Sequence, residues 1–155
     1  MKPKQLRTSV KAIIVRNNRI LLAKYVDEVG DWYCLPGGGQ SHGEPLPDAL
    51  RRECMEEIGV RLRVGRLVLV RDYIAKNHEF AATDSYLHQV ELMFECEVEG
   101  EYEPAIGTTP DKGQVGAAWL ELEKLNEYRV YPKVLPDLLR DGVPSEGVVY
   151  LGDVN

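Results

Sequence analysis

The feature that most constrains this chain is a glycine run followed by a charged helix. Three consecutive glycines, residues 37–39, precede Pro45 and Pro47, and proline fits the first turn of a helix, where backbone donors have no intrahelical partner. Gly59 suits the left-handed residue that ends a helix. The sequence therefore predicts a helix from about Pro45 to Ile58, preceded by a glycine loop.

The predicted helix carries three glutamates on one face. Glu56 and Glu57 lie within about 60° of Glu53 on a helical wheel, and this face continues the apolar stripe of the first two turns. Carboxylates that converge there repel one another unless a cation lies between them, and Mg²⁺ and Mn²⁺ prefer carboxylate oxygens. Arg52 is placed to hold a carboxylate in a fixed orientation.

An isolated Arg-Glu-x-x-Glu-Glu pattern is usually a solvated helix face. Three features together favour a metal site instead: the glycine loop before the helix, the face that the glutamates share with apolar residues, and the glycine that ends the helix.

Residues 38–60 resemble the signature box of the Nudix (MutT-type) hydrolases. The resemblance rests on Gly38, on Glu44 after five intervening residues, and on Arg-Glu-x-x-Glu-Glu-x-Gly-Val over residues 52–60. Cys54 stands where the family usually has an aliphatic residue, and a buried cysteine behaves as a small hydrophobe. The resemblance implies one Nudix domain over residues 1–155, an α+β fold with a mixed β-sheet in an α/β/α sandwich.

The resemblance also implies a role for each box residue. Glu53, Glu56 and Glu57, helped by the carbonyl of Gly37, are expected to hold Mg²⁺ or Mn²⁺, and with Arg52 they form the expected catalytic group. The general base is expected to be either Glu53 or an acidic residue in a loop, and the sequence does not decide between them. Further substrate contacts are expected from Lys24, Arg7, Gly38, Asp111 and Gln114, with Lys11 a weaker candidate.

The composition of the chain limits the kinds of partner that it can bind. The chain has 155 residues, 44% of them hydrophobic, and a formal net charge of −6, so a nucleic-acid partner is disfavoured while a small phosphorylated substrate bound through a metal is compatible. Cys34, Cys54 and Cys96 have no paired spacing and are interpreted as reduced, buried thiols. With no long apolar run, no membrane partner is expected, and the predicted location is cytoplasmic.

The rest of the chain is read as strands, two loops and a second helix. Alternating residues at 88–99 predict a half-buried strand, on which Glu91, Glu95 and Glu97 are interpreted as solvated charges. Asn17 and Asn18 predict a tight turn. The full prediction is a hairpin over 9–15 and 19–24, strands at 61–72, 117–122 and 147–151, long loops at 73–86 and 101–116, and a helix at 131–139.

The expected activity is Mg²⁺- or Mn²⁺-dependent hydrolysis of a diphosphate linkage in a nucleoside diphosphate derivative. The first expected substrate is an ADP-sugar such as ADP-ribose, and the second is a nucleoside triphosphate, including an oxidised one. A Nudix-like sensing domain without turnover is the alternative from another class, and a prenyl diphosphate isomerase is a minor third. A homodimer through residues 128–131 and 148–151 is also considered.

Overall fold

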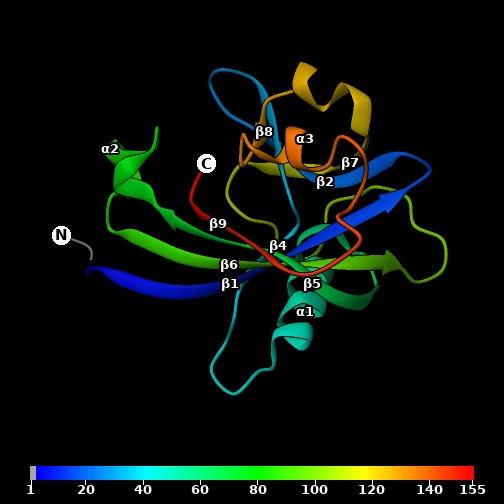
Figure 1. Ribbon diagram of the computed structural model, residues 1–155, viewed down its shortest axis with the longest axis horizontal. Coiled ribbons are helices and arrows are strands. Elements are labelled where there is room, and N and C mark those ends of the chain that lie inside the picture. The colour runs from blue at the N-terminus through cyan, green and yellow to red at the C-terminus, as the bar shows by residue number, and fades with distance from the viewer. Residues whose placement is uncertain (1–2) are drawn as a thin grey trace.

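The strand-forming segments on both sides of the signature box build one mixed β-sheet, shown by a computed structural model that describes residues 3–155. The sheet is strongly curled, and α1 lies on one side of it while α3 lies on the other (Figure 1). The strands are β1 (Gln5–Arg16), β2 (Arg19–Val26), β3 (Asp31–Cys34), β4 (Gly37–Gly39), β5 (Leu62–Ile74), β6 (Leu87–Val98), β7 (Gln114–Glu121), β8 (Val130–Tyr131) and β9 (Val149–Asp153).

Over residues 3–155 five helical segments complete the fold, and α1 is the only one of them that exceeds six residues. They are the α-helices α1 (Leu46–Ile58), α2 (Ala81–Asp84) and α3 (Leu135–Leu138) and the 3₁₀ helices η1 (Ala75–Asn77) and η2 (Leu122–Glu127). The strand order is β8-β3-β2-β1-β6-β5-β9, with β4 paired to β1 and β7 paired to β2. β1 and β6 are parallel, whereas β5 and β6 are antiparallel. The predicted α+β sandwich with a mixed sheet is confirmed.

The predicted hairpin is formed by β1 and β2, and its turn depends on two asparagines. Asn17 and Asn18 have positive φ values of 52° and 58°. Asparagine tolerates this region better than most residues, and two successive positive φ angles give a turn whose twist matches that of the strands. The hairpin contact is short, because β1 then diverges to pair with β6 and β4.

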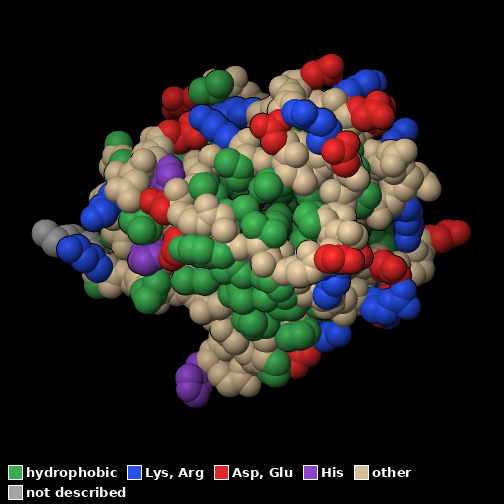
Figure 2. All heavy atoms as spheres, viewed as in Figure 1, with side chains coloured by type: hydrophobic (Ala, Val, Ile, Leu, Met, Phe, Trp, Pro, Cys, Tyr) green, Lys and Arg blue, Asp and Glu red, His purple; other side chains and the backbone are tan. Residues whose placement is uncertain are grey.

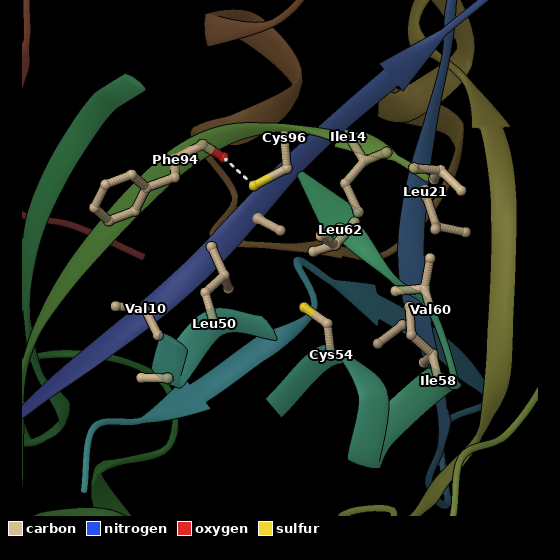
Figure 3. Packing of buried hydrophobic residues seen from close by; sticks show 14 of the residues in the cluster. Val10, Ile14, Leu21, Leu50, Cys54, Ile58, Val60, Leu62, Phe94 and Cys96 are labelled. Atoms are coloured by element: carbon tan, nitrogen blue, oxygen red, sulfur yellow. Dashed lines mark hydrogen bonds between the residues drawn. The ribbon is translucent and has the colours of Figure 1, made fainter. Parts of the chain in front are cut away.

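Two hydrophobic clusters fill the two sides of the sheet. One packs α1 against β1, β2 and β6 and includes Leu50, Cys54, and Ile58, all with no exposed surface (Figure 3). The other lies under η2 and α3 and includes Ile13, Met93 and Leu135. Successive β1 residues alternate between the two clusters, as strand geometry requires. Lys11 therefore shares its face of β1 with Ile13, away from α1.

Three sequence-based expectations are corrected by the structure. The helix expected at 131–139 shrinks to the four residues of α3, because Val130 and Tyr131 pair with β3 and Pro136 lies in the first turn of α3. The segment 73–86 is not a plain loop, since it holds the end of β5, η1 and α2. Glu91 is not solvated: only 3% of it is exposed.

The outer surface of the molecule is mixed in character. Figure 2 shows hydrophobic side chains gathered in the middle of one face, with charged side chains around its margin. Tyr150 on β9, an edge strand, is 63% exposed, and Val148, just before β9, is 53% exposed. Over residues 3–155 there is no helix long and apolar enough to cross a membrane.

Candidate active site

The glycine loop that precedes α1 is held against β1 by backbone pairing. In β4, Gly37 lies opposite Lys11 and Gly38 lies opposite Val10. Gly37 has a φ of 137°, and a Cβ atom there would approach the carbonyl oxygen of Val10 to 2.0 Å. Only glycine fits this position, so the close approach of loop and strand requires the glycine that the sequence supplies.

The end of α1 is closed by a second loop, distant in sequence. Gly59 ends the helix with a φ of 66°, and the backbone N–H groups of Gly107 and Thr109 donate to the carbonyls of Glu57 and Glu56 at 2.7 and 2.9 Å. These are helix C-terminal carbonyls without an intrahelical partner. The loop over 101–113 is therefore docked on the carboxylate-bearing turn of α1.

Glu57 is the most buried of the three box glutamates, with 2% of its surface exposed. Its Oε2 accepts a hydrogen bond of 3.3 Å from the backbone N–H of Gly37, whereas its buried Oε1 has no partner in the described structure. Burial is the main reason why the pKa of Glu57 is raised from 4.5 to about 7; Lys11 opposes this shift and Asp111 adds to it. A buried, incompletely bonded carboxylate is costly unless a cation or donor joins it.

Arg52 organises the remaining acids of the box. Its guanidinium donates to both carboxylate oxygens of Glu44 at 2.8 and 2.9 Å, to Glu53 at 2.9 Å and to Glu56 at 3.3 Å. It also donates to the carbonyl of Gly39 at 3.0 Å. This fork-shaped network ties the loop to α1 and holds the pKa of Glu44 at about 2, chiefly through the Arg52 hydrogen bonds.

Replacing Arg52 by lysine is expected to weaken divalent-metal affinity about 10- to 100-fold, the range found when groups that orient metal ligands are lost. An ammonium retains the charge but not the planar set of donors that serves three carboxylates at once. Isothermal titration with Mn²⁺ measures the effect. Arg51→Lys is the matched control, because Arg51 is exposed and forms its ion pair with Asp48, away from the three carboxylates that Arg52 contacts. Equal affinities for the two variants would contradict the orienting role.

Glu53 is packed directly on the backbone of the glycine loop. A Cβ atom at residue 38 would lie 2.5 Å from Oε2 of Glu53. The loop backbone and this carboxylate therefore occupy adjacent space, which a side chain at Gly38 would invade. The helix and the loop together place Glu53 beside Gly38 and Glu57 beside Gly37.

The carboxylates of the box are the type of ligand that a divalent cation prefers, but their oxygens do not converge on one point. Over residues 3–155 no group of three or more His, Cys, Asp or Glu side chains is gathered in metal-binding geometry. Glu53 and Glu56 are both turned towards Arg52. The unpartnered Oε1 of Glu57 and the concentration of carboxylates around it favour a hard cation at this place. The carbonyl of Gly37, also expected as a ligand, accepts a hydrogen bond of 3.3 Å from the ammonium of Lys11.

Of the other residues expected to contact the substrate, Asp111 and Gln114 lie close to the carboxylates of α1. Asp111 accepts a hydrogen bond from Tyr25 Oη at 3.3 Å and is close enough to raise the pKa of Glu57. The Gln114 side chain accepts from the backbone N–H of Asp111 at 3.0 Å, and its Nε2 is buried without a described partner. These two residues form one turn beside the carboxylates.

The two expected basic contacts lie at the margin. Lys24 forms an ion pair of 2.9 Å with Asp31 on the neighbouring strand, so its ammonium is engaged within the protein. Arg7 is exposed on β1, and its guanidinium lies beside the loop, 3.1 Å from where a Cβ atom of Gly39 would be. Their roles towards a substrate stay predictions.

A cavity of about 190 Å³ lies among β1, β3, β5, β6 and β8. Trp32 stacks on Tyr25 with ring centroids 4.2 Å apart and meets Tyr131 edge-on at 5.7 Å. Trp32 is therefore both a packed aromatic and a wall of the cavity. The lining consists of Lys11, Trp32, Cys34, Leu35, Arg71, Tyr73, Phe80, Glu91, Tyr131, Pro132 and Asn155.

Arg71 and Glu91 are the two charged cavity residues that the sequence did not indicate as site residues. They lie directly opposite each other on β5 and β6 and form a two-pronged ion pair with N–O distances of 2.9 and 3.2 Å. Arg71 is 6% exposed and Glu91 3%. Along β6, Glu91 alternates with the hydrophobic residues, and this alternation predicted that Glu91 lies on the solvent-exposed face of the strand. Glu91 is buried only because another layer of the structure covers that face.

The three cysteines are free, and Cys54 and Cys96 are buried as expected. Cys34 is half-buried and lines the cavity. Burial raises the pKa of Cys34 to about 11 and that of Cys96 to about 12. None of these three thiols is poised as a nucleophile at neutral pH.

Comparison with known proteins agrees with this site. Residues 5–138 match the family model described as NUDIX domain. The nucleoside triphosphatase NudI of Enterobacter sp. (strain 638) is 35% identical over 95 residues, which are 58% of this chain and 67% of that protein.

Two solved structures have the same fold. A NUDIX hydrolase from Nitrosomonas europaea superposes with a TM-score of 0.69 at 19% identity, over 90% of this chain and 88% of that one. A MutT NUDIX hydrolase from Burkholderia pseudomallei superposes with a TM-score of 0.59 at 31% identity, over 77% of this chain and 85% of that one.

Fold and site together define a hydrolase of phosphorus-containing anhydrides, with a glycine loop and a carboxylate-bearing helix at its centre. The chain belongs to the Nudix family, as a pyrophosphohydrolase.

Proposed function

We propose that this protein hydrolyses a diphosphate linkage of a nucleotide with the help of Mg²⁺ or Mn²⁺. The observation that carries the proposal is the carboxylate of Glu57, buried beside the glycine loop with one oxygen unpartnered. Glu53, Glu56 and Glu57 would hold the cation, which when bound would neutralise charge on the diphosphate and lower the pKa of a water molecule.

The protein's own groups orient the reactants. Arg52 fixes the carboxylates of Glu44, Glu53 and Glu56, and the backbone at Gly38 allows close approach to Glu53. The proton of the attacking water needs a carboxylate acceptor. Glu53 and Asp111 are the two candidates, and comparison of Glu53→Gln with Asp111→Asn separates them.

We assign the nucleoside part of the substrate to the aromatic cavity. Flat rings of Trp32, Tyr73, Phe80 and Tyr131 line it, and Lys11 connects it with the loop at Gly37. Aromatic rings provide stacking surfaces for a base of any kind. A volume of about 190 Å³ suits one base rather than a whole dinucleotide, whose remainder would extend along the carboxylates.

A nucleoside triphosphate is the substrate class that we place first, since the relative at 35% identity is a nucleoside triphosphatase. ADP-ribose, preferred from the sequence, stays a prediction and is tested in the same assay. The proposed test is a turnover screen with Mg²⁺ and with Mn²⁺ over nucleoside triphosphates, ADP-ribose, other nucleoside diphosphate sugars and dinucleoside polyphosphates. Release of pyrophosphate or AMP from one class supports the proposal. Tight binding without turnover would favour a sensing domain.

Divalent cations are expected to stabilise the folded protein. A cation that binds only the folded state at 100 times its dissociation constant adds about 2.7 kcal/mol to the free energy of unfolding. Thermal unfolding with and without Mg²⁺ measures the shift. The shift should vanish in Glu57→Gln, and an equal shift in that variant would exclude Glu57 as a ligand.

The expected homodimer also remains a proposal, supported by the exposure of Val148 and of Val149 and Tyr150 on β9, an edge strand of the sheet. Sedimentation of the wild-type chain tests it, and a Tyr150→Glu variant should then dissociate.

A further inference from the structure

Three charged side chains cross the floor of the aromatic cavity on adjacent strands. Lys11 lies on β1, Glu91 on β6 and Arg71 on β5, and all three line the cavity. Ser9, two residues before Lys11, is paired with Glu91, and Glu91 is paired with Arg71. The order across the sheet is therefore positive, negative, positive, in a cavity whose other lining residues include the aromatic side chains of Trp32, Tyr73, Phe80 and Tyr131.

The guanidinium of Arg71 forms its hydrogen bonds with other groups of the protein. Its Nε and one terminal nitrogen donate to the two oxygens of Glu91. The other terminal nitrogen donates to the carbonyl of Val154 at 2.7 Å and to the Asn155 side chain at 3.3 Å. Arg71 therefore acts as a positioning residue, which holds the Glu91 carboxylate in one orientation while each of its oxygens retains a further lone pair.

Lys11 has donors to spare. An ammonium carries three N–H groups, and among the described residues Lys11 donates a hydrogen bond to one acceptor, the carbonyl of Gly37. Burial opposes the charge of Lys11, but Cys34, Glu91 and Glu57 together raise its pKa, so the side chain is charged at neutral pH. The cavity thus offers a ligand one cationic donor and, two residue positions away across the sheet, one fixed anionic acceptor.

From this arrangement we propose that Lys11 and Glu91 select the base of the substrate, favouring one with a keto–imide edge. Such an edge presents a carbonyl oxygen beside a ring N–H, as in hypoxanthine, guanine and uracil. The carbonyl accepts from Lys11 and the ring N–H donates to Glu91. The inference rests on the proposed function, since it assigns the cavity to the base of the nucleotide.

The physical reason is the fixed polarity of the two groups. Adenine and cytosine present an amino group where the keto bases present the carbonyl, and an unprotonated ring nitrogen where the keto bases present the N–H. The cationic donor of Lys11 would then face a donor, and the carboxylate of Glu91 would face an acceptor. A site built from buried polar groups also rejects analogues that leave those groups unpaired, because the cost of desolvation is then not recovered.

The test uses two pairs of nucleotides that differ in this edge, ITP against ATP and UTP against CTP. We expect kcat/KM to favour the keto member of each pair by about 10-fold or more. Lys11→Met and Glu91→Gln should each reduce the ratio towards one. The matched controls are Lys124→Met and Glu97→Gln, whose parent side chains are exposed and outside the cavity, and these should keep the wild-type ratio.

The ratio within a pair distinguishes base selection from a structural role, because loss of the Lys11–Gly37 contact alone would slow both members equally. Calorimetric binding of IMP and AMP provides a readout that does not need turnover. If wild-type protein binds IMP more tightly but hydrolyses nothing, the proposed function fails and base selection stands. Equal handling of both pairs, a preference for adenine, or an unchanged ratio in Lys11→Met and Glu91→Gln would overturn the inference.

Discussion

Glu57→Gln is expected to abolish most of the activity, by on the order of 10³-fold in kcat, while leaving the metal-free fold intact or more stable. The glutamine keeps the size of the side chain and an oxygen for the Gly37 N–H, but it removes the negative charge that a divalent cation needs. Losing several kcal/mol of charge stabilisation corresponds to a loss of this size. Steady-state kinetics with saturating Mg²⁺ measures it.

The stability of this variant is the second readout. Burial raises the pKa of Glu57 to about 7, which shows that the folded, metal-free protein disfavours its charge. A neutral side chain removes that penalty, so the thermal midpoint without metal should be equal to or above that of the wild type. Glu99→Gln, at an exposed position, is the control for both measurements. Full turnover by Glu57→Gln would refute the proposed role of the box.

The largest expected loss of stability follows from Arg71→Met. Removing one partner of a buried ion pair leaves the other charge without compensation, and this typically costs about 3–5 kcal/mol. The variant also loses the hydrogen bond from Arg71 to the Val154 carbonyl, which helps to hold the segment after β9. Denaturant unfolding at neutral pH measures the free energy of unfolding.

The same two strands supply a matched control. Arg63 on β5 pairs with Glu97 on β6, but their side chains are 69% and 66% exposed. Arg63→Met should therefore cost less than about 1 kcal/mol, as exposed pairs usually do. Similar losses in both variants would show that burial does not govern the contribution of the Arg71–Glu91 pair.

The pH dependence of the Arg71→Met effect has a defined sign. Burial opposes ionisation of Glu91, yet Arg71, and then Lys11, hold the pKa of Glu91 below its ordinary value. A depressed pKa contributes stability above the pKa of the unfolded chain, about 4.3, and this contribution is lost as the pH falls through the folded value. The gap between wild type and Arg71→Met should therefore be full at neutral pH and narrow in acid.

Several helices, strands and turns could be predicted from the conformational preferences of neighbouring residues. The prolines and Gly59 bracket α1, which begins at Leu46, one residue after the predicted start. The Asn17–Asn18 turn and β6 follow from backbone preference and alternation. The segment 131–139 was predicted as one helix, weakened by Pro136, but pairing of β8 with β3 takes its first residue into a strand.

The sequence by itself determined the class of this protein, because the chemistry of the box lies within 23 consecutive residues of the sequence, 38–60. Spacing along one helix suffices to predict a shared carboxylate face. It did not determine the cavity, since Lys11, Arg71 and Glu91 come from three strands and meet only when β1, β6 and β5 pair. The burial of Glu91 depends on the layer packed above its strand, and alternation within a strand carries no information about what covers each face.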